Sequence, residues 1–320
     1  MKPSNQPTIP SSPSPTLILG TAMWGWTTPR AACFELLDDF YRHGFREVDG
    51  ATNYPINKRP EDFRKAENIL LEWIKAHEIK DLKVMMKVGS INNMRTPENN
   101  LSKSFLLMLL DEYRNLFGSN LDTFMIHWDN RAAEAEIRES LEALARAREL
   151  GVRAGLSGIK HPEAYAQLNK EFGFNFRIQF KHNILQSDYP RYKPFHGKAG
   201  FITYGINAGG IKLDPKEYGR GSSLMARGGK TEEEPAIARP LKAILGKATR
   251  TEGRPGVSSF NHCGMTFAYH SPDVTGILLG ASTSKQLKDS LEFFSALKTY
   301  NYRDLYERLK ELHEKQAGKV

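Results

Sequence analysis

The stretch TFMIHWDNRAAEAEIRESLEALARARELGVRAGL, residues 123–156, holds one full repeating unit of this chain. Its apolar run 123–127 predicts a β-strand, and residues 133–150 place apolar side chains at the spacing of an amphipathic helix. The helical pattern stops at Gly151, as helices commonly do at glycine, and a second apolar run follows at 153–156. A strand, a helix and another strand in this order predict a parallel βαβ unit.

The same alternation continues along the whole chain. Helical patterns include residues 284–297, with Thr283 available as the N-cap, and a last helix at 303–316. Eight strand–helix units predict an α/β fold closed into a (β/α)8 TIM barrel rather than an open sheet. We expect residues 17–320 to form this barrel as one domain with a C-terminal helix, and the Pro/Ser-rich residues 1–16 to be a disordered tail. The other expected strands are 17–19, 45–48, 84–88, 176–180, 201–204 and 276–279.

Composition argues against several classes of protein. Lys and Arg number 45 against 37 Asp and Glu, and the net charge of +8 is spread along the chain, which is not typical of a nucleic-acid binder. No apolar run approaches the roughly 18 residues of a membrane-spanning helix. The two cysteines, Cys33 and Cys263, suit neither a disulfide framework nor a metal site. We therefore expect a cytoplasmic protein without a metal; the sequence does not indicate its oligomeric state.

Polar residues stand where three consecutive strands end. Asp49 follows the second predicted strand, Lys87 lies in the third and His127 ends the fourth, at spacings of 38 and 40 residues. Chemistry in such barrels takes place at the C-terminal ends of the strands. We expect these residues to converge on one rim, with Tyr54 brought in by a short loop.

These residue types suit the reduction of a carbonyl group, which requires a hydride on carbon and a proton on oxygen. Tyr54 would be the general acid, and the Lys87 ammonium is expected to lower its pKa from about 10. Asp49 would keep Lys87 charged, and a neutral His127 would orient the carbonyl. Singly, each residue has a purely structural explanation, such as a lysine whose stem covers apolar surface. Their combination indicates catalysis.

With these residues in this order, the sequence resembles the aldo-keto reductase family. The segment 49–54, Lys87 and His127 stand where that family carries its catalytic Asp, Tyr, Lys and His. The resemblance spans about residues 17 to 298 and includes Leu19-Gly20-Thr21 and the segments 155–157, 178–183 and 279–287.

The resemblance implies an NAD(P)(H) site. Ser157 and Gln179 would hold the nicotinamide carboxamide, Tyr204 would stack on its ring, and segment 280–287 would contact the adenosine ribose and its 2′-phosphate. We favour NADP(H), with NAD(H) as the alternative. The full set of expected cofactor residues is Gly20, Thr21, Ser157, Gln179, Tyr204, Gly280, Ser282, Thr283 and Lys285.

Three positions depart from the family pattern. Gly158 replaces an asparagine, residues 205–207 replace Ser-Pro-Leu, and Ser282 stands where many members have a basic residue. The glycine-rich segment 205–234 is expected to fold over the cofactor pyrophosphate. Its cations are Lys212, Arg220, Arg227 and Lys230.

Trp24, Trp26 and Trp128 are expected to wall the substrate pocket, which suits aryl aldehydes and also sugars or other small hydroxylated carbonyl compounds. One alternative is a non-catalytic, cofactor-sensing member of the same fold that regulates a partner protein. Another is a barrel aldolase with Lys87 as the Schiff base, which leaves Tyr54 and segment 280–287 unexplained.

Overall fold

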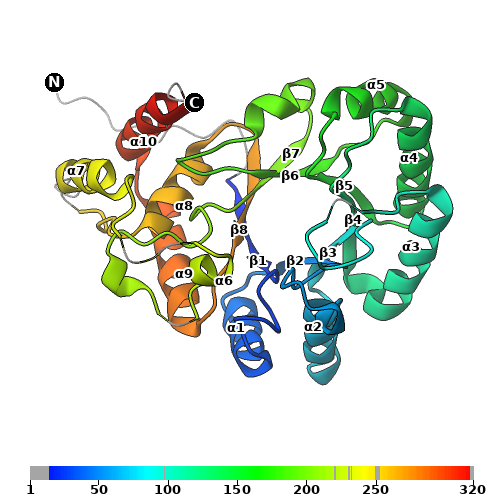
Figure 1. The fold of residues 1–320 in the computed structure, drawn as a ribbon, viewed down its shortest axis with the longest axis horizontal. Helices are drawn as coiled ribbons and strands as arrows, with labels where there is room; N and C mark the ends of the chain where they lie inside the picture. Colours follow the sequence, from blue (N-terminus) through cyan, green and yellow to red (C-terminus); the bar gives the residue numbers. More distant parts are fainter. Residues whose placement is uncertain are drawn as a thin grey trace.

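The computed structural model describes residues 14–96, 98–219, 221–229, 231, 233–248 and 253–317. Within them, eight parallel strands pair in chain order, and the last returns to the first to close a barrel (Figure 1). The predicted (β/α)8 barrel is therefore confirmed. The strands are β1 (Thr16–Gly20), β2 (Glu47–Ala51), β3 (Lys83–Val88), β4 (Leu121–His127), β5 (Arg153–Ser157), β6 (Arg177–Lys181), β7 (Gly200–Tyr204) and β8 (Val274–Leu279).

Only part of the expected N-terminal tail, residues 1–16, can be compared with the structure. Its residues 1–13 lie outside the described residues, and Thr16 already belongs to β1.

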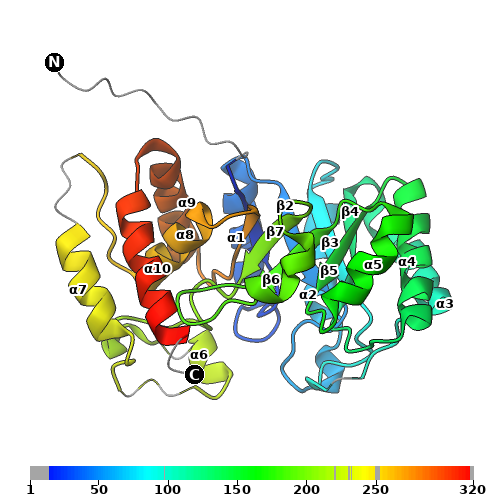
Figure 2. The ribbon, with the colours of Figure 1, turned by 90° about the horizontal axis from the view of Figure 1, so that it is seen from above.

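Helices surround the ring of strands. Figures 1 and 2 both place α3 to α5 on one side of the barrel and α7 to α10 on the other. None of the helices in the described part of the chain is long and apolar enough to cross a membrane. The helices are α1 (Arg30–Arg42), α2 (Lys65–Ala76), α3 (Lys103–Phe117), α4 (Glu134–Glu149), α5 (Pro162–Phe172), α6 (Ser223–Ala226), α7 (Ala238–Ala248), α8 (Phe260–His270), α9 (Ser284–Thr299) and α10 (Arg303–Ala317), with 3-10 turns at Pro60–Asp62, Gly118–Asn120, Tyr189–Phe195 and Pro215–Glu217.

The connection from β7 to β8 contains α6, α7 and α8, which the sequence analysis did not predict. Helix α8 buries most of its residues, so it lacks the polar face that marks an amphipathic helix. Gly264 lets α8 approach the backbone after β7: an added Cβ would lie 2.2 Å from the Ile206 carbonyl oxygen. This contact fixes the start of the segment 205–234 at the rim.

The barrel interior has an apolar middle between two polar ends. Ile18 of β1, Met85 of β3 and Ile202 of β7 form the middle, and Leu278 packs against them. Side chains two residues apart on a strand point the same way. Glu47 and Asp49 on β2 therefore project inward at opposite ends of the barrel.

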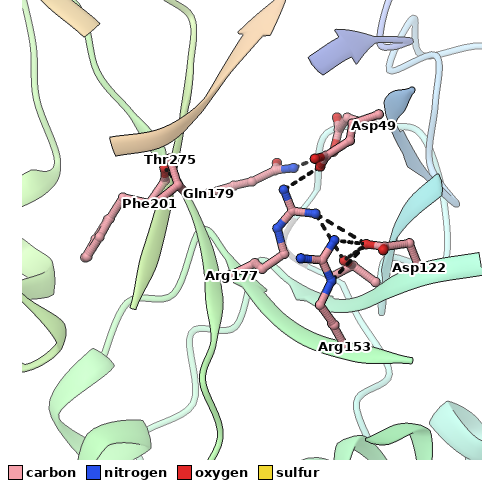
Figure 3. Close-up of polar contacts among 9 residues, drawn as sticks. Asp49, Asp122, Arg153, Arg177, Gln179, Phe201 and Thr275 are labelled. Atoms are coloured by element: carbon pink, nitrogen blue, oxygen red, sulfur yellow. Dashed lines mark hydrogen bonds and ion pairs between the residues drawn. The ribbon is translucent and has the colours of Figure 1, made fainter. Parts of the chain in front are cut away.

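An ion-pair cluster occupies the N-terminal end. Arg177 of β6 reaches across the interior, where its Nη2 lies 2.6 Å from Glu47 Oε2, and its Nη1 lies 3.3 Å from Asp122 Oδ2. Asp122 also binds Arg153 at 2.5 Å, as Figure 3 shows. Each of the Arg177 and Glu47 side chains exposes less than a fifth of its surface (10% and 16%). The cluster therefore fills this end of the barrel with mutually compensating charges.

At the opposite rim, Gly158 directly follows β5 in left-handed backbone with a φ of +67°. A Cβ added there would lie 2.6 Å from Cδ1 of Trp128. The position of the Trp128 ring therefore accounts for glycine at this site.

Replacing Arg177 with methionine is expected to destabilise the fold by on the order of 3 kcal/mol, because Glu47 would stay in the barrel without its cation. Urea denaturation measures the change. Arg138→Met is the matched control, because it breaks an exposed pair with Glu171 and should barely move the midpoint. Equal midpoints for the two variants would show that the cluster does not stabilise the barrel.

Gly158→Asn is expected to lower stability by about 1–3 kcal/mol through overlap with the Trp128 ring. Gly44→Asn is the control, because Gly44 is also left-handed, with a φ of +86°, but an added Cβ meets no described atom within 4 Å. Thermal unfolding of both variants separates overlap from backbone strain. If both lose the same stability, the tryptophan is not the cause.

Candidate active site

A cavity of about 210 Å³ opens at the C-terminal ends of the strands. Asp49 of β2, Lys87 of β3 and His127 of β4 line it, together with Tyr54 from the loop after β2. The structure thus brings together the four residues that sequence reasoning selected as catalytic. Three of them come from consecutive strands, because each β/α unit returns the chain to the same rim.

Asp49 and Lys87 form an ion pair inside the barrel. Lys87 Nζ lies 2.5 Å from both carboxylate oxygens of Asp49, and the two side chains expose 1% and 2% of their surface. The Gln179 amide also donates to Asp49 Oδ1 at 2.5 Å, as Figure 3 shows. Burial lowers the pKa of Lys87, and the Asp49 charge opposes that shift. The carboxylate therefore both positions the lysine and neutralises its charge.

The Tyr54 ring lies beside this pair, with Lys87 Nζ 4.8 Å from its centroid. Burial raises the pKa of Tyr54, Asp49 raises it further, and Arg227 opposes both. The expectation that Lys87 lowers this pKa is wrong for the structure. Because Asp49 neutralises the lysine at close range, burial dominates, and Tyr54 is held in its protonated form.

His127 stands across the cavity with its ring perpendicular to that of Tyr54, at a centroid distance of 6.3 Å. Burial and, secondly, the charge of Lys87 hold the pKa of His127 well below its usual range, so the ring is neutral. Its Nδ1 is buried without a hydrogen-bond partner among the described residues. Nε2 is therefore the ring nitrogen that can meet a ligand in the cavity.

A second cavity of about 480 Å³ adjoins the first and shares Asn207, Ser223, Gly280 and Ala281 with it. Ser282 and Thr283 line its outer part, next to the N-terminus of α9. The two cavities form one groove with polar groups at both ends. An elongated molecule with a flat polar head and a phosphate-bearing tail, such as a nicotinamide dinucleotide, fits this distribution.

The expected nicotinamide residues do not all have free hydrogen-bonding groups. Gly20, Ser157, Gln179 and Tyr204 line the inner cavity, but the Gln179 amide nitrogen is already bonded to Asp49. The Thr21 hydroxyl donates to the Asp49 backbone oxygen at 2.9 Å. The Thr21 hydroxyl is therefore used in a hydrogen bond within the protein, to the backbone of β2.

At the outer end, the Thr283 side chain caps α9 by accepting from the Gln286 backbone N–H. Gln286 in turn accepts from the Ser282 backbone N–H at 2.9 Å and lines the outer cavity. Gln286 lies in the segment 280–287 that was expected to contact the adenosine ribose, but it was not singled out as a cofactor residue, although Thr283-x-x-Gln286 is the sequence signature of a capping box. Lys285 is exposed, and the described residues that line the groove do not include it.

Two of the three expected wall residues, Trp24 and Trp128, line the inner cavity. Trp26 is not among the described residues of that wall; the Arg95 guanidinium lies 5.5 Å from its ring. A role for Trp26 in binding the substrate stays a prediction. Met23 and Ile56, which carried no polar signal in the sequence, complete this side of the cavity.

The segment 205–234 runs along both cavities. Lys212 lines the outer cavity and Arg227 the inner one. Arg220 and Lys230, also expected to meet phosphate, lie outside the described residues. The segment therefore contributes cations at two separate places along the groove.

Comparison with known proteins identifies the family and a similar fold. The Aldo/keto reductase family model matches residues 16–310. Protein tas of Escherichia coli (strain K12) and of Shigella flexneri are each 23% identical over 87% of this chain and 88% of their own. The fold is similar to that of aldo-keto reductase AKR11C1 from Bacillus halodurans in its holo form, with a TM-score of 0.67, 17% identity, and 92% and 91% of the two chains covered. The chain belongs to the aldo/keto reductase family.

Proposed function

We propose that this chain reduces the carbonyl group of an aldehyde or ketone to an alcohol, with NADP(H) as its cofactor. The family assignment supports an NAD(P)H-dependent carbonyl oxidoreductase in general. The main support for the proposal is that Tyr54, His127 and the Lys87–Asp49 pair line one cavity, which continues along the groove.

The nicotinamide, when bound, supplies the hydride for the carbonyl carbon. Tyr54 donates its hydroxyl proton to the carbonyl oxygen. Its raised pKa keeps the hydroxyl protonated at neutral pH but makes it a weaker acid, so the proton moves as negative charge develops on that oxygen. The tyrosinate left behind lies beside the Lys87 ammonium, whose stabilising charge Asp49 largely offsets. Neutral His127 donates a hydrogen bond from Nε2 to the same oxygen and so orients the substrate. Asp49 acts through Lys87 by holding it in place.

For the cofactor of this groove we propose NADP(H), with NAD(H) as the alternative. Ser282 and Lys212 line its outer part and suit a phosphate, whereas Glu217 and Asp289 in the same cavity oppose extra negative charge. The faces of Trp24 and Trp128 suit a flat or ring-shaped substrate, so an aryl aldehyde, a sugar or another hydroxylated carbonyl compound is the proposed class.

Steady-state loss of NADPH absorbance with a panel of aryl aldehydes and sugars tests the activity, and NADH is run in parallel. Turnover of at least one carbonyl compound is expected. Tight binding of the cofactor without turnover of any would favour a cofactor-sensing regulator instead.

Tyr54→Phe is expected to lower kcat by at least about 100-fold, because the proton donor is lost. NADPH affinity, measured by fluorescence titration, should barely change. In the wild-type protein, a raised Tyr54 pKa means that the proton stays bound to higher pH than the usual value of about 10. Reduction should therefore lose no rate to tyrosine ionisation through the neutral range. An active Phe variant would place the acid elsewhere.

Lys87→Met is expected to lower kcat by at least about 100-fold. It should also lower the free energy of unfolding by on the order of 3 kcal/mol, because Asp49 stays buried without its cation. Adding Asp49→Asn removes the uncompensated charge. The double variant should regain most of the stability, measured by urea denaturation, but none of the activity. Recovery of both would show that Lys87 serves folding alone.

A further inference from the structure

Arg227 directly follows α6 and lines the same cavity as Tyr54 and His127. Its Nη2 lies 3.3 Å from the Met23 sulfur, and the residue keeps part of its surface in solvent at the cavity mouth. Within the described part of the chain, Arg227 forms no ion pair with a carboxylate. A weak thioether acceptor leaves most of its five N–H donors available for another group.

The other ionisable groups of the cavity leave it without a compensating negative charge. Lys87 and Asp49 cancel each other, His127 is neutral and Tyr54 keeps its proton. Burial lowers the pKa of Arg227, Tyr54 opposes that shift, and the nearby charge of Arg95 adds to it. The cavity mouth is therefore electropositive, and an anion there would relieve the uncompensated charge.

Arg227 could bind one of two anions, a cofactor phosphate or an anionic group on the substrate, and its position indicates which. The outer cavity, lined by residues 280–283 and by Lys212, does not include Arg227 among its described residues. Arg227 instead contacts Met23 and lies close enough to Tyr54 to influence its pKa. Because Tyr54 is the group that would protonate the carbonyl, the substrate is the nearer partner.

We propose that Arg227 is a specificity-determining residue that binds a carboxylate on the carbonyl substrate. The inference rests on the proposed carbonyl reduction and narrows its substrate to carbonyl compounds that carry an acid group. A planar guanidinium pairs with a carboxylate through two parallel hydrogen bonds, which fixes the orientation as well as the charge of the substrate. One guanidinium at the mouth matches the single charge of a carboxylate.

Two aldehydes that differ in one charge test this proposal: 4-carboxybenzaldehyde and its methyl ester. Arg227→Gln should lower kcat/KM for the carboxylate by about 10- to 100-fold, as expected for the loss of a charge-assisted pair. Any effect of Arg227 on the pKa of Tyr54 acts on both aldehydes alike, so the ratio of the carboxylate kcat/KM to the ester kcat/KM should fall by about the same factor, while the KM for NADPH stays within about twofold. Lys216→Gln, which removes an exposed cation from the same segment, is the matched control and should preserve the wild-type preference.

An equal loss for both aldehydes, or a higher KM for NADPH with the preference intact, would overturn the proposal. Binding of 4-(hydroxymethyl)benzoate and of its methyl ester, followed by tryptophan fluorescence, gives a second readout that needs no turnover. If the wild-type protein reduces neither of these aldehydes nor any compound of the panel, the proposed function fails by itself. The binding measurement still tests whether Arg227 binds a carboxylate. Weaker binding of 4-(hydroxymethyl)benzoate to Arg227→Gln supports this role, and unchanged binding refutes it.

Discussion

The ion pair between Lys87 and Asp49 is buried at the C-terminal end of the barrel, where neither side chain exposes more than 2% of its surface. Taking both charges out of water is costly, and only close, hydrogen-bonded pairing offsets that cost. Both carboxylate oxygens are used by Lys87, and Gln179 adds a further donor. This requirement fixes β2, β3 and β6 relative to one another, and it sets the electrostatic field in which Tyr54 works.

The two polar ends of the barrel differ in their distance from the candidate chemistry. Glu47 and Asp49 occupy the same face of β2, and Arg177 and Gln179 occupy the same face of β6. Each of these strands therefore places one polar side chain at each end of the barrel. The ion pairs at the N-terminal end lie beyond the apolar layer around Ile18, away from the candidate active site. Substitutions at that end are therefore expected to change stability with little effect on catalysis.

Much of the fold and of the candidate site could be predicted from local sequence, because each strand is a short apolar run and polar residues mark the strand ends. The buried helix α8 could not, since it has no polar face to give a periodic signal. Nor could the direction of the Tyr54 pKa shift, which depends on how closely Asp49 neutralises Lys87. The glycine at position 158 likewise depends on a long-range contact with the Trp128 ring.

Transfer of deuterium from NADPH labelled at both C4 positions to an aldehyde is the most direct measurement of hydride transfer at this site. Wild-type protein should yield an alcohol that carries one deuterium on the former carbonyl carbon, in an amount equal to the NADPH consumed. Mass spectrometry of the product distinguishes the outcomes. An alcohol without deuterium, or NADPH that stays unoxidised with every aldehyde offered, would contradict carbonyl reduction in this cavity.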